Sequence, residues 1–417
     1  MCGVYVCLSY TWGRRSTCVT TPDSLQSNLN NIPYDQLQQT YKDAVTVALA
    51  LNFPFLWIDS LCIIQGDEDS VDWKEQSSQM ADIYGNAELF ERHQNTQPRL
   101  EVHTRPMLDH SWLGWSTLAE PKAEGTLSRS WCFQEEVLAA RLLTFYRGEM
   151  NFQCLDELYE PRLELGSPYE TPNWRWQSTV EHYTQRTLLL ATDRLTALSG
   201  VARVAQSALR TRYVAGHWWD ADFLRSLCWA PVRTEETERT FSADCYVAPS
   251  CSWAAHNGPV TMWIPYAGSE EPVTPRFLGK TSVRDVSVVP ATRGDDVGAV
   301  SSGNITVRGV FLGVAVDAKL REQSLGVMKR NGEEITLGFD RPPGLTSATD
   351  RYFCWVASVL PGQASRRRKS ETHCRIVLRG KPGGPEHVWE CVGFVGYESC
   401  MRFFEGYRKL DRIAVTA

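Results

Sequence analysis

Apolar and polar residues alternate along the first half of the chain in runs that predict strands separated by helices. The run "GVYVCLSY" (3–10) is rich in β-branched and aromatic residues, and "FPFLWIDSLCII" (53–64) has the same character, so both predict buried strands. Residues 34–51 have a helical period between them. The apolar face of that helix is expected to hold Leu37, Tyr41, Ala44, Val45, Ala48 and Leu49. Strand, helix and strand at this length predict a βαβ unit and therefore a parallel sheet.

The pattern continues with a further helix in "SVDWKEQSSQMADIYGNAEL" (70–89), where Gly85-Asn86 is a stop signal. Residues 91–107 are polar without a clear period and are predicted as a loop. Helix is predicted to resume at "SWCFQEEVLAARLLTFY" (130–146) and to lead into strands through "LLTFYRG" and "MNFQC". Residues 174–230 are predicted to be mainly helical. From about residue 245 the chain consists of short β-rich runs with turn residues, which is typical of an antiparallel sheet or small barrel.

The order of these patterns predicts the domains. A chain of 417 residues is long for one core, and its length favours two or three domains. We expect an α/β domain over 1–160, a helical region over 161–240 that packs on it, and a β-rich C-terminal domain over 241–417.

Composition narrows the class of protein. A net charge of -6 and a pI near 5.8 argue against general binding to nucleic acid or to an acidic membrane. No apolar run approaches the roughly 20 residues that span a bilayer, and the N-terminus has no signal-peptide pattern. The thirteen cysteines form no Cys-x-x-Cys pair, so we expect no metal site and a reducing compartment. The expected location is the cytoplasm.

Polar residues at the ends of the two first strands are candidates for a binding site. Asp59 follows a buried apolar run, where an acid can bind a ribose hydroxyl at the carboxyl edge of a parallel sheet; equally, it can cap the next turn. "LSYTWG" places Ser9, Tyr10 and Trp12 at the end of the first strand. Neither a dinucleotide-binding glycine motif nor a P-loop is present. Ser9, Ser60 and Cys62 are candidate nucleophiles, but no histidine lies near them in sequence and no nucleophile-elbow motif occurs.

The stretch "SRSWCFQEEVLAARLL" (128–143) contains an acidic pair. In a helix, Trp131, Glu135 and Leu138 share one face at i, i+4 and i+7. Glu136 falls about 100° further round and is expected to be solvated. Exposure of both glutamates is the common case for helical glutamates in general, so the spacing alone leaves both alternatives open.

Three blocks in order resemble the fungal heterokaryon-incompatibility (HET) domain family: "YVCLSYTWG", "FLWIDSLCIIQGDEDSVDWKEQSSQMADIYGNAEL" and "SRSWCFQEEVLAARLLTF". The resemblance implies a role in self/non-self recognition that leads to regulated cell death. It also implies a fold related to the Toll/interleukin-1 receptor (TIR) domain, a flavodoxin-like α/β sandwich with a parallel sheet and flanking helices. One departure is that the family continues after "YGNAEL" with an apolar strand, where this chain has "FERHQNTQPRLEVHTRP".

The TIR relation implies a site. "SRSWCFQEE" is similar to a TIR helix motif whose glutamate, four residues after the tryptophan, is catalytic in NAD-cleaving members; here that position is Glu135. The resemblance therefore implies an NAD glycohydrolase with NAD as substrate and no prosthetic group. Its pocket is expected to hold Ser9, Tyr10, Trp12, Asp59 and Trp131.

Two alternatives stay open at this point. The first is a non-catalytic signalling module that self-assembles or binds a partner protein. The second is a scaffold used as a biosynthetic enzyme on another nucleotide-linked substrate.

Overall fold

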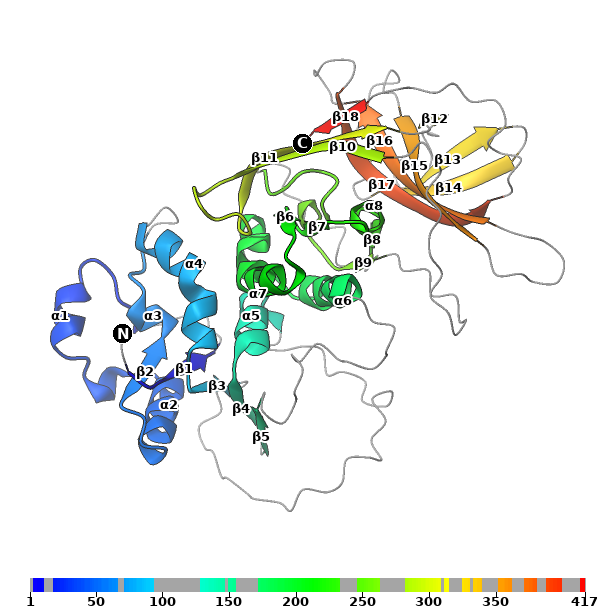
Figure 1. Cartoon of the computed structure of the whole chain (residues 1–417). Helices are drawn as coiled ribbons and strands as arrows, with labels where there is room; N and C mark the ends of the chain where they lie inside the picture. The colour runs from blue at the N-terminus through cyan, green and yellow to red at the C-terminus, as the bar shows by residue number, and fades with distance from the viewer. Residues whose placement is uncertain are drawn as a thin grey trace. The chain divides into compact units, whose positions relative to one another are not determined.

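The computed structural model of the chain (Figure 1) describes fifteen segments. They are residues 3–10, 18–66, 71–93, 128–146, 149–154, 172–232, 246–262, 282–308, 311–314, 325–330, 333–339, 352–361, 371–380, 388–399 and 413–416. The chain divides into two compact units. Unit 1 comprises Met1–Leu165, Arg186–Leu188 and Thr196–Val204, and unit 2 comprises Gly166–Gln185, Leu189–Leu195 and Ala205–Ala417. The three-part division expected from sequence stays a prediction.

Unit 1 alternates strands and helices. In chain order its elements are β1 (Tyr5–Ser9), α1 (Leu25–Asn30), a 3₁₀ helix (Tyr34–Gln36), α2 (Gln39–Ala50), β2 (Phe55–Ile58), α3 (Asp59–Cys62), α4 (Val71–Gly85), β3 (Leu89–His93), α5 (Trp131–Leu138), β4 (Arg141–Tyr146) and β5 (Glu149–Cys154). A second 3₁₀ helix (Thr196–Leu198) and the first residues of α7 (Ser199–Leu209) complete it. The α/β class predicted from sequence is confirmed for this unit.

The described strands of unit 1 form one sheet in the order β2-β1-β3-β4-β5. The pairs β1–β2, β1–β3 and β3–β4 are parallel, and β4–β5 is antiparallel. A parallel βαβ unit was predicted and is present, although its second strand ends at Ile58, where α3 begins. "LFERH" forms the central strand β3, so the loop predicted from residue 91 is wrong as far as His93; residues 94–107 lie outside the described residues.

The sheet of unit 1 buries apolar side chains on both faces, because successive residues of a strand point to opposite sides. Along β1, Cys7 packs with α4 and α5, whereas Leu8 packs with α2. The core on the α4/α5 face contains Cys7, Trp57, Ile63, Met80, Tyr84, Ala87, Ala139 and Leu142. On α2 the predicted face is buried at Tyr41, Ala44 and Ala48, but Leu49 is 69% exposed, since it lies a further 100° round the helix.

Unit 2 begins with helices and small hairpins and continues as a large sheet. Its first elements are α6 (Pro172–Thr184), a 3₁₀ helix (Ala191–Arg194), the end of α7, β6 (Arg212–Val214), β7 (His217–Trp219), α8 (Phe223–Ser226), β8 (Trp229–Pro231), a 3₁₀ helix (Trp253–Ala255) and β9 (Val260–Met262). The mainly helical pattern predicted for 174–230 therefore contains three short strands, and β6–β7 and β8–β9 pair antiparallel.

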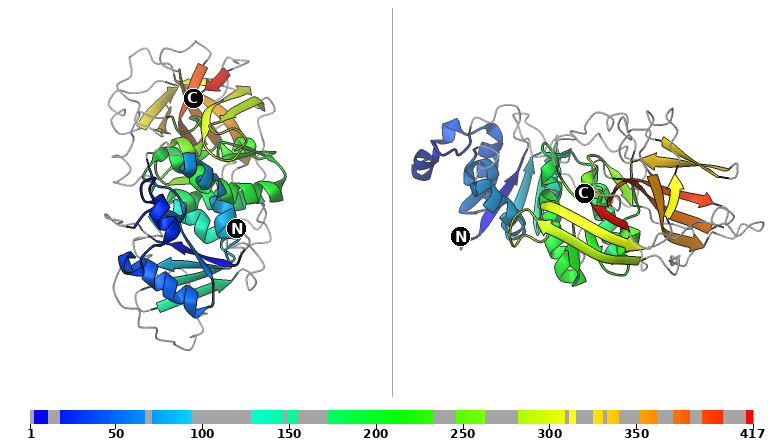
Figure 2. Two further views of the ribbon diagram at one scale, coloured as in Figure 1. Left: turned by 90° about the vertical axis from the view of Figure 1, so that its left-hand side faces the viewer. Right: turned by 90° about the horizontal axis from the view of Figure 1, so that it is seen from above.

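The β-rich part of unit 2 is a sheet whose described strands are ordered β10-β11-β18-β17-β16-β15-β12, with β14 on β17 and β13 on β14. The strands are β10 (Ser282–Pro290), β11 (Val300–Arg308), β12 (Phe311–Val314), β13 (Leu325–Arg330), β14 (Glu333–Phe339), β15 (Tyr352–Pro361), β16 (Glu371–Gly380), β17 (Val388–Ser399) and β18 (Ile413–Thr416). The long strands β15, β16 and β17 lie side by side in antiparallel register (Figure 2).

A tight turn between β6 and β7 organises an aromatic core in unit 2. Both residues of its two-residue loop have positive φ, 42° at Ala215 and 100° at Gly216, which is the geometry of a type I′ turn. The Gly216 carbonyl accepts hydrogen bonds from the indoles of Trp176 and Trp253, each at 2.9 Å. A Cβ on Gly216 would lie 2.5 Å from Trp253 Nε1, so the position accepts only glycine without rearrangement.

Candidate functional site

The strongest polar contact between β1 and α5 joins Ser9 to Glu135. Ser9 Oγ donates a hydrogen bond to Glu135 Oε2 at 2.6 Å, and Cys132 Sγ lies 3.6 Å from the same hydroxyl. We call these three residues the Ser9 cluster. The exposed fractions of Ser9, Cys132 and Glu135 are 2%, 2% and 8%. Among the described residues, Ser9 is the hydrogen-bond partner of the Glu135 carboxylate, through Oε2.

Local structure explains why these residues meet. Ser9 is the last residue of β1 and is two residues after Cys7, so its side chain points to the face that α4 and α5 cover. Glu135 is on the buried side of α5, four residues after Trp131. The strand order places β2 on one side of β1 and β3 on the other. In parallel α/β sheets, ligands bind at the carboxyl ends of the strands where the order reverses in this way, and Ser9 lies at that end.

Buried groups around the Ser9 cluster stay neutral. The pKa of the Tyr84 phenol is raised well above its usual value, first by burial and then by the negative charges of Glu135 and Asp59. Burial, followed by the charge of Glu135, also raises the pKa of the Cys7 thiol. The charges of both predicted site carboxylates, Glu135 and Asp59, thus act on the pKa of Tyr84. Neither the Tyr84 phenol nor the Cys7 thiol adds a negative charge beside them.

Tyr10 does not join the Ser9 cluster. It is the residue after Ser9 and its side chain points to the opposite face of the sheet, where it packs with Leu8 and Ile58. Its hydroxyl hydrogen-bonds that of Tyr41, which in turn lies 2.5 Å from Ser60 Oγ. Tyr10 therefore belongs to a buried hydroxyl chain between β1, α2 and α3, away from Glu135.

The remaining predicted site residues have distinct surroundings. Asp59 is the first residue of α3, and its Oδ1 accepts a hydrogen bond from Ser60 N at 2.6 Å; the N-cap of α3 is Ile58, without a side-chain capping hydrogen bond. Trp131 is half-buried at the start of α5, with its ring edge-on to Trp73 at 5.7 Å between centroids. Trp12 lies outside the described residues.

The expectation of a solvated Glu136 is corrected by the structure. The Glu136 side chain is 27% exposed, and its Oε2 accepts a hydrogen bond from Arg186 at 2.8 Å. Arg186 lies fifty residues further along the chain, so no local pattern could have indicated the pair.

Three further residues of the site were missed by sequence reasoning. Cys132 is beside Ser9, and Gln134 is 1% exposed with its Oε1 accepting from Gly200 N at 3.3 Å. Tyr84 is fully buried against the site. The signal for Tyr84 was its place on the apolar face of α4. For Cys132 and Gln134, three residues and one residue before Glu135, the helical pattern gave no indication of polar partners.

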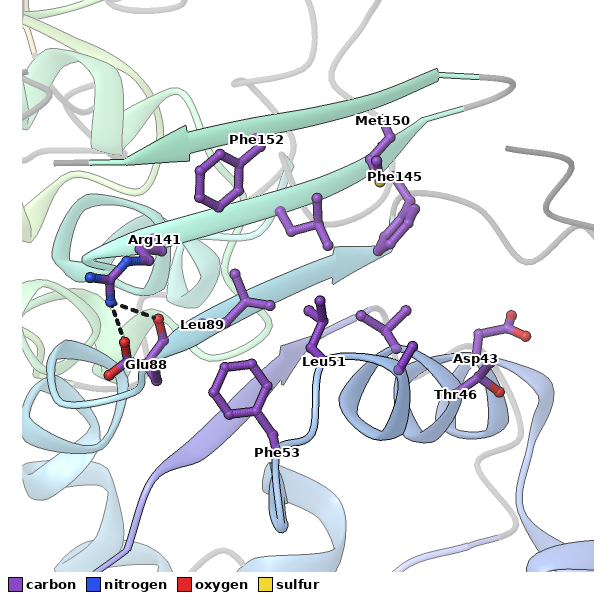
Figure 3. A pocket seen from close by; sticks show the side chains of 13 residues that line it. Asp43, Thr46, Leu51, Phe53, Glu88, Leu89, Arg141, Phe145, Met150 and Phe152 are labelled. Carbon is purple, nitrogen blue, oxygen red and sulfur yellow. Dashed lines mark hydrogen bonds and ion pairs between the residues drawn. The ribbon is translucent and has the colours of Figure 1, made fainter. Parts of the chain in front are cut away.

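An apolar groove lies on the opposite face of the unit 1 sheet (Figure 3). It runs between α2 and strands β3, β4 and β5, with a volume of about 720 Å³. The apolar side chains that line it are Val47, Ala50, Leu51, Phe53, Leu89, Leu143, Phe145, Met150 and Phe152. At one end, Arg141 pairs with Glu88 at 2.6 Å. The groove does not contain Glu135 and is not part of the Ser9 cluster.

Two classes of site find no support in the part of the chain that the structure describes. No group of three or more histidine, cysteine, aspartate or glutamate side chains there is arranged to hold a metal ion. None of the described helices is both long and apolar enough to cross a membrane.

Comparison with protein families identifies the part of the chain that holds the Ser9 cluster. Residues 5–135 match the family model of the heterokaryon incompatibility protein (HET). The chain carries a HET domain. The match begins at the first residue of β1 and ends at Glu135 in α5, so the HET domain includes both ends of the Ser9–Glu135 hydrogen bond. Searches of curated proteins and of solved structures gave no significant match.

Proposed function

We propose that this HET domain acts in self/non-self recognition leading to regulated cell death, and that it does so by hydrolysing NAD at the nicotinamide–ribose bond. The family match supports the first part. The observation that supports the second is the buried hydrogen bond between Ser9 and Glu135 at the carboxyl end of β1. A carboxylate held in one orientation beside a buried strand end is suited to stabilising a developing positive charge.

The chemistry needs few groups. The bond from ribose C1′ to the nicotinamide nitrogen breaks, and its electron pair neutralises the pyridinium, so the leaving group requires no acid. The ribose then carries oxocarbenium character, which a carboxylate stabilises, as in glycoside hydrolysis. Water forms the new bond to C1′ and releases its proton, which Glu135 accepts. No prosthetic group is involved, and NAD is the substrate.

The proposal also assigns the other residues. Asp59 and Trp131 contact the ribose and a base, while Ser9 holds the carboxylate that reacts. Tyr10 is omitted because its hydroxyl is bonded to Tyr41 on the other face, and Trp12 stays a prediction. A TIR-like, flavodoxin-like relation is part of the proposal, supported by the strand order β2-β1-β3-β4-β5; the antiparallel β5 is a departure from it. We further propose that the protein acts in the cytoplasm and self-assembles.

The test is turnover of NAD by the full chain over a concentration series that extends to self-association. Wild-type protein is expected to release nicotinamide and ADP-ribose in equal amounts, measured by chromatography. Glu135→Gln keeps the size of the side chain and removes its charge, and is expected to abolish turnover. Glu88→Gln is the matched control, since this glutamate lies exposed on β3's flank and pairs with Arg141; it should keep full activity.

Three results would count against the proposal. Turnover that survives Glu135→Gln would remove Glu135 as the catalytic residue. A wild-type protein that consumes no NAD at any concentration would remove the reaction and would favour a non-catalytic signalling module. Turnover of another nucleotide-linked compound in place of NAD would favour the biosynthetic alternative.

A further inference from the structure

The helix that carries Glu135 is held by chain segments beyond the end of the HET match. Gln134 and Glu136 flank Glu135 in sequence, and both have partners from later in the chain. Gln134 Oε1 accepts a hydrogen bond from Gly200 N at 3.3 Å. Glu136 Oε2 accepts one from Arg186 Nη2 at 2.8 Å. The family match stops at residue 135, so neither partner is within it.

The same later segment also fixes the start of α5. Thr187 forms a parallel β-bridge with Arg129, with Ser130 N donating to Thr187 O at 2.9 Å and Thr187 N donating to Ser128 O at 2.6 Å. The Arg186 guanidinium lies over the Phe133 ring, 4.8 Å from its centre. Residues 186–188 thus hold α5 by its backbone, by a ring and by a charge.

These contacts are needed because α5 is weak by itself. It has eight residues, and helices this short are not stable in water without tertiary contacts. Its N-cap Ser130 makes no side-chain capping hydrogen bond. The Arg186 and Glu136 side chains are 12% and 27% exposed, so their ion pair is shielded from solvent more than the Arg141–Glu88 pair, at 36% and 47%.

The geometry of the two partners determines the rotation of α5. Successive residues of a helix are separated by about 100° around its axis, so Gln134 and Glu136 lie on either side of Glu135. Holding both prevents the helix from rotating in either direction. Gly200 permits the close approach, since a Cβ there would lie 2.3 Å from Ala81 Cβ and 2.8 Å from Gln134 Oε1.

We propose that Arg186 is a positioning residue for Glu135, and that the HET site of this protein is completed by Arg186, Thr187 and Gly200, which lie outside the segment that matches the family model. The inference rests on the proposed function in its kinetic consequence only. Segment Arg186–Leu188 belongs to unit 1 although the residues on both sides of it along the chain belong to unit 2. A protein cut after the family match would lack these contacts.

The experiment compares Arg186→Gln with Arg141→Gln in the full chain. Arg141→Gln is the matched control, because it removes an ion pair of the same unit, that with Glu88. Hydrogen exchange is measured in peptides that cover α5 and α2. Arg186→Gln is expected to raise exchange in α5 and leave α2 unchanged, whereas Arg141→Gln leaves α5 unchanged.

Kinetics distinguish positioning from a merely structural role. Arg186→Gln is expected to lower kcat per folded molecule about tenfold with little change in KM, since misplacement of a catalytic group affects the transition state more than binding. The double variant Glu136→Arg/Arg186→Glu restores an ion pair of reversed polarity and is expected to recover most of kcat. Arg186→Lys keeps the charge, and its kcat should lie between that of Arg186→Gln and that of the wild type. This variant replaces Arg186→Gln in the comparison if Arg186→Gln does not fold.

Each result decides the inference. Unchanged α5 exchange in Arg186→Gln would overturn it, as would a kcat equal to that of wild type. A kcat loss that the reversed pair does not recover would reduce Arg186 to a structural residue and would also overturn it. If wild-type protein consumes no NAD, the proposed function fails while the exchange measurement still tests whether Arg186 holds α5.

Discussion

The two units of the protein treat buried polar groups differently. In unit 1 they hydrogen-bond to one another's side chains: Ser9 to Glu135, and Tyr10 through Tyr41 to Ser60. In unit 2 three buried aromatic side chains donate to main-chain carbonyls: Trp176 and Trp253 to Gly216 O, and Tyr183 to Arg194 O at 2.6 Å. The Ser9–Glu135 contact of unit 1 places a carboxyl group in a buried hydrogen bond, whereas these contacts of unit 2 fix aromatic rings in its core.

The difference assigns different roles to the units. Unit 1 holds a carboxylate with one oxygen in a hydrogen bond, which is an arrangement that can do chemistry. Unit 2 packs the buried His217 against the Phe223 ring, with the Ser226 hydroxyl as its hydrogen-bond partner, which favours a rigid scaffold. Substitutions in unit 2 should therefore lower stability, whereas substitutions at the Ser9 cluster should lower activity.

The largest effect is expected at the β6–β7 turn of unit 2. Gly216→Ala introduces both a Cβ 2.5 Å from Trp253 Nε1 and a side chain at a φ of 100°, and should lower the free energy of unfolding of unit 2. Strain and overpacking together predict a loss of about 3 kcal/mol. Gly294→Ala is the matched control, because its φ is 87° and no atom lies within 4 Å of the added Cβ among the described residues.

The control separates backbone strain from steric clash. Gly294→Ala should cost only the strain of the left-handed region, about 1 kcal/mol. Denaturation is followed by hydrogen exchange in unit 2 peptides, because a chain with two units need not unfold in one step. Equal losses in the two variants would show that packing against Trp253 contributes nothing.

A pH effect of intermediate size is expected from His217 in unit 2. Burial lowers the pKa of this imidazole from 6.5 to about 3, and its Nε2 has no hydrogen-bond partner among the described residues. Below pH 6.5 the unfolded chain binds a proton that the folded protein does not, so the stability is present above pH 6.5 and is lost as the pH falls toward 3. The loss between pH 6.5 and 5 is about 2 kcal/mol.

The variant His217→Phe tests this origin. It keeps a ring beside Phe223 and removes the titrating group. The loss of unfolding free energy of unit 2 between pH 6.5 and 5 should therefore become smaller by about 2 kcal/mol. Unfolding is measured in denaturant at pH 7, 6 and 5. A slope identical to that of wild type would show that His217 is not the group responsible.

The smallest effect is expected in the hydroxyl chain of unit 1. Tyr41→Phe removes the hydroxyl between Tyr10 and Ser60 and should lower the stability of unit 1 by about 1 kcal/mol. NAD turnover should stay at the wild-type level, because the chain lies on the face of the sheet away from Glu135. Activity and exchange are measured on the same sample, and a fall in kcat without loss of stability would contradict the separation of the two faces.

Sequence patterns predicted the elements of unit 1 well and those of unit 2 less well. The strand within 3–10, the helix within 34–51 and the helix that ends at the Gly85-Asn86 stop signal were found because apolar spacing within one element is a local property. The strands β6, β7 and β8 were missed because each has three residues, too few for a period to be visible. β3 was missed because "FERH" is polar, although it pairs on both sides in the sheet.

The candidate site was predicted in part for the same reason. Helical spacing separated Glu135 from Glu136, and in the structure Glu135 is buried, with 8% of its surface exposed. The same spacing predicted that Glu136 is exposed to solvent, because a local pattern contains no information about Arg186. Ser9 and Tyr10 stand together in the motif, yet only Ser9 contacts Glu135, since adjacent strand residues point to opposite faces.

By itself the sequence determined the α/β alternation, the family and the glutamate that merits a test, because each depends on local spacing or on an uninterrupted motif. Tertiary structure decided which motif residues share a face with Glu135 and what holds α5 in place. Those contacts join residues separated by 50 to 126 positions, such as Arg186 with Glu136 and Ser9 with Glu135. Partners at such separation are set by strand order and packing, and a local pattern carries no record of them.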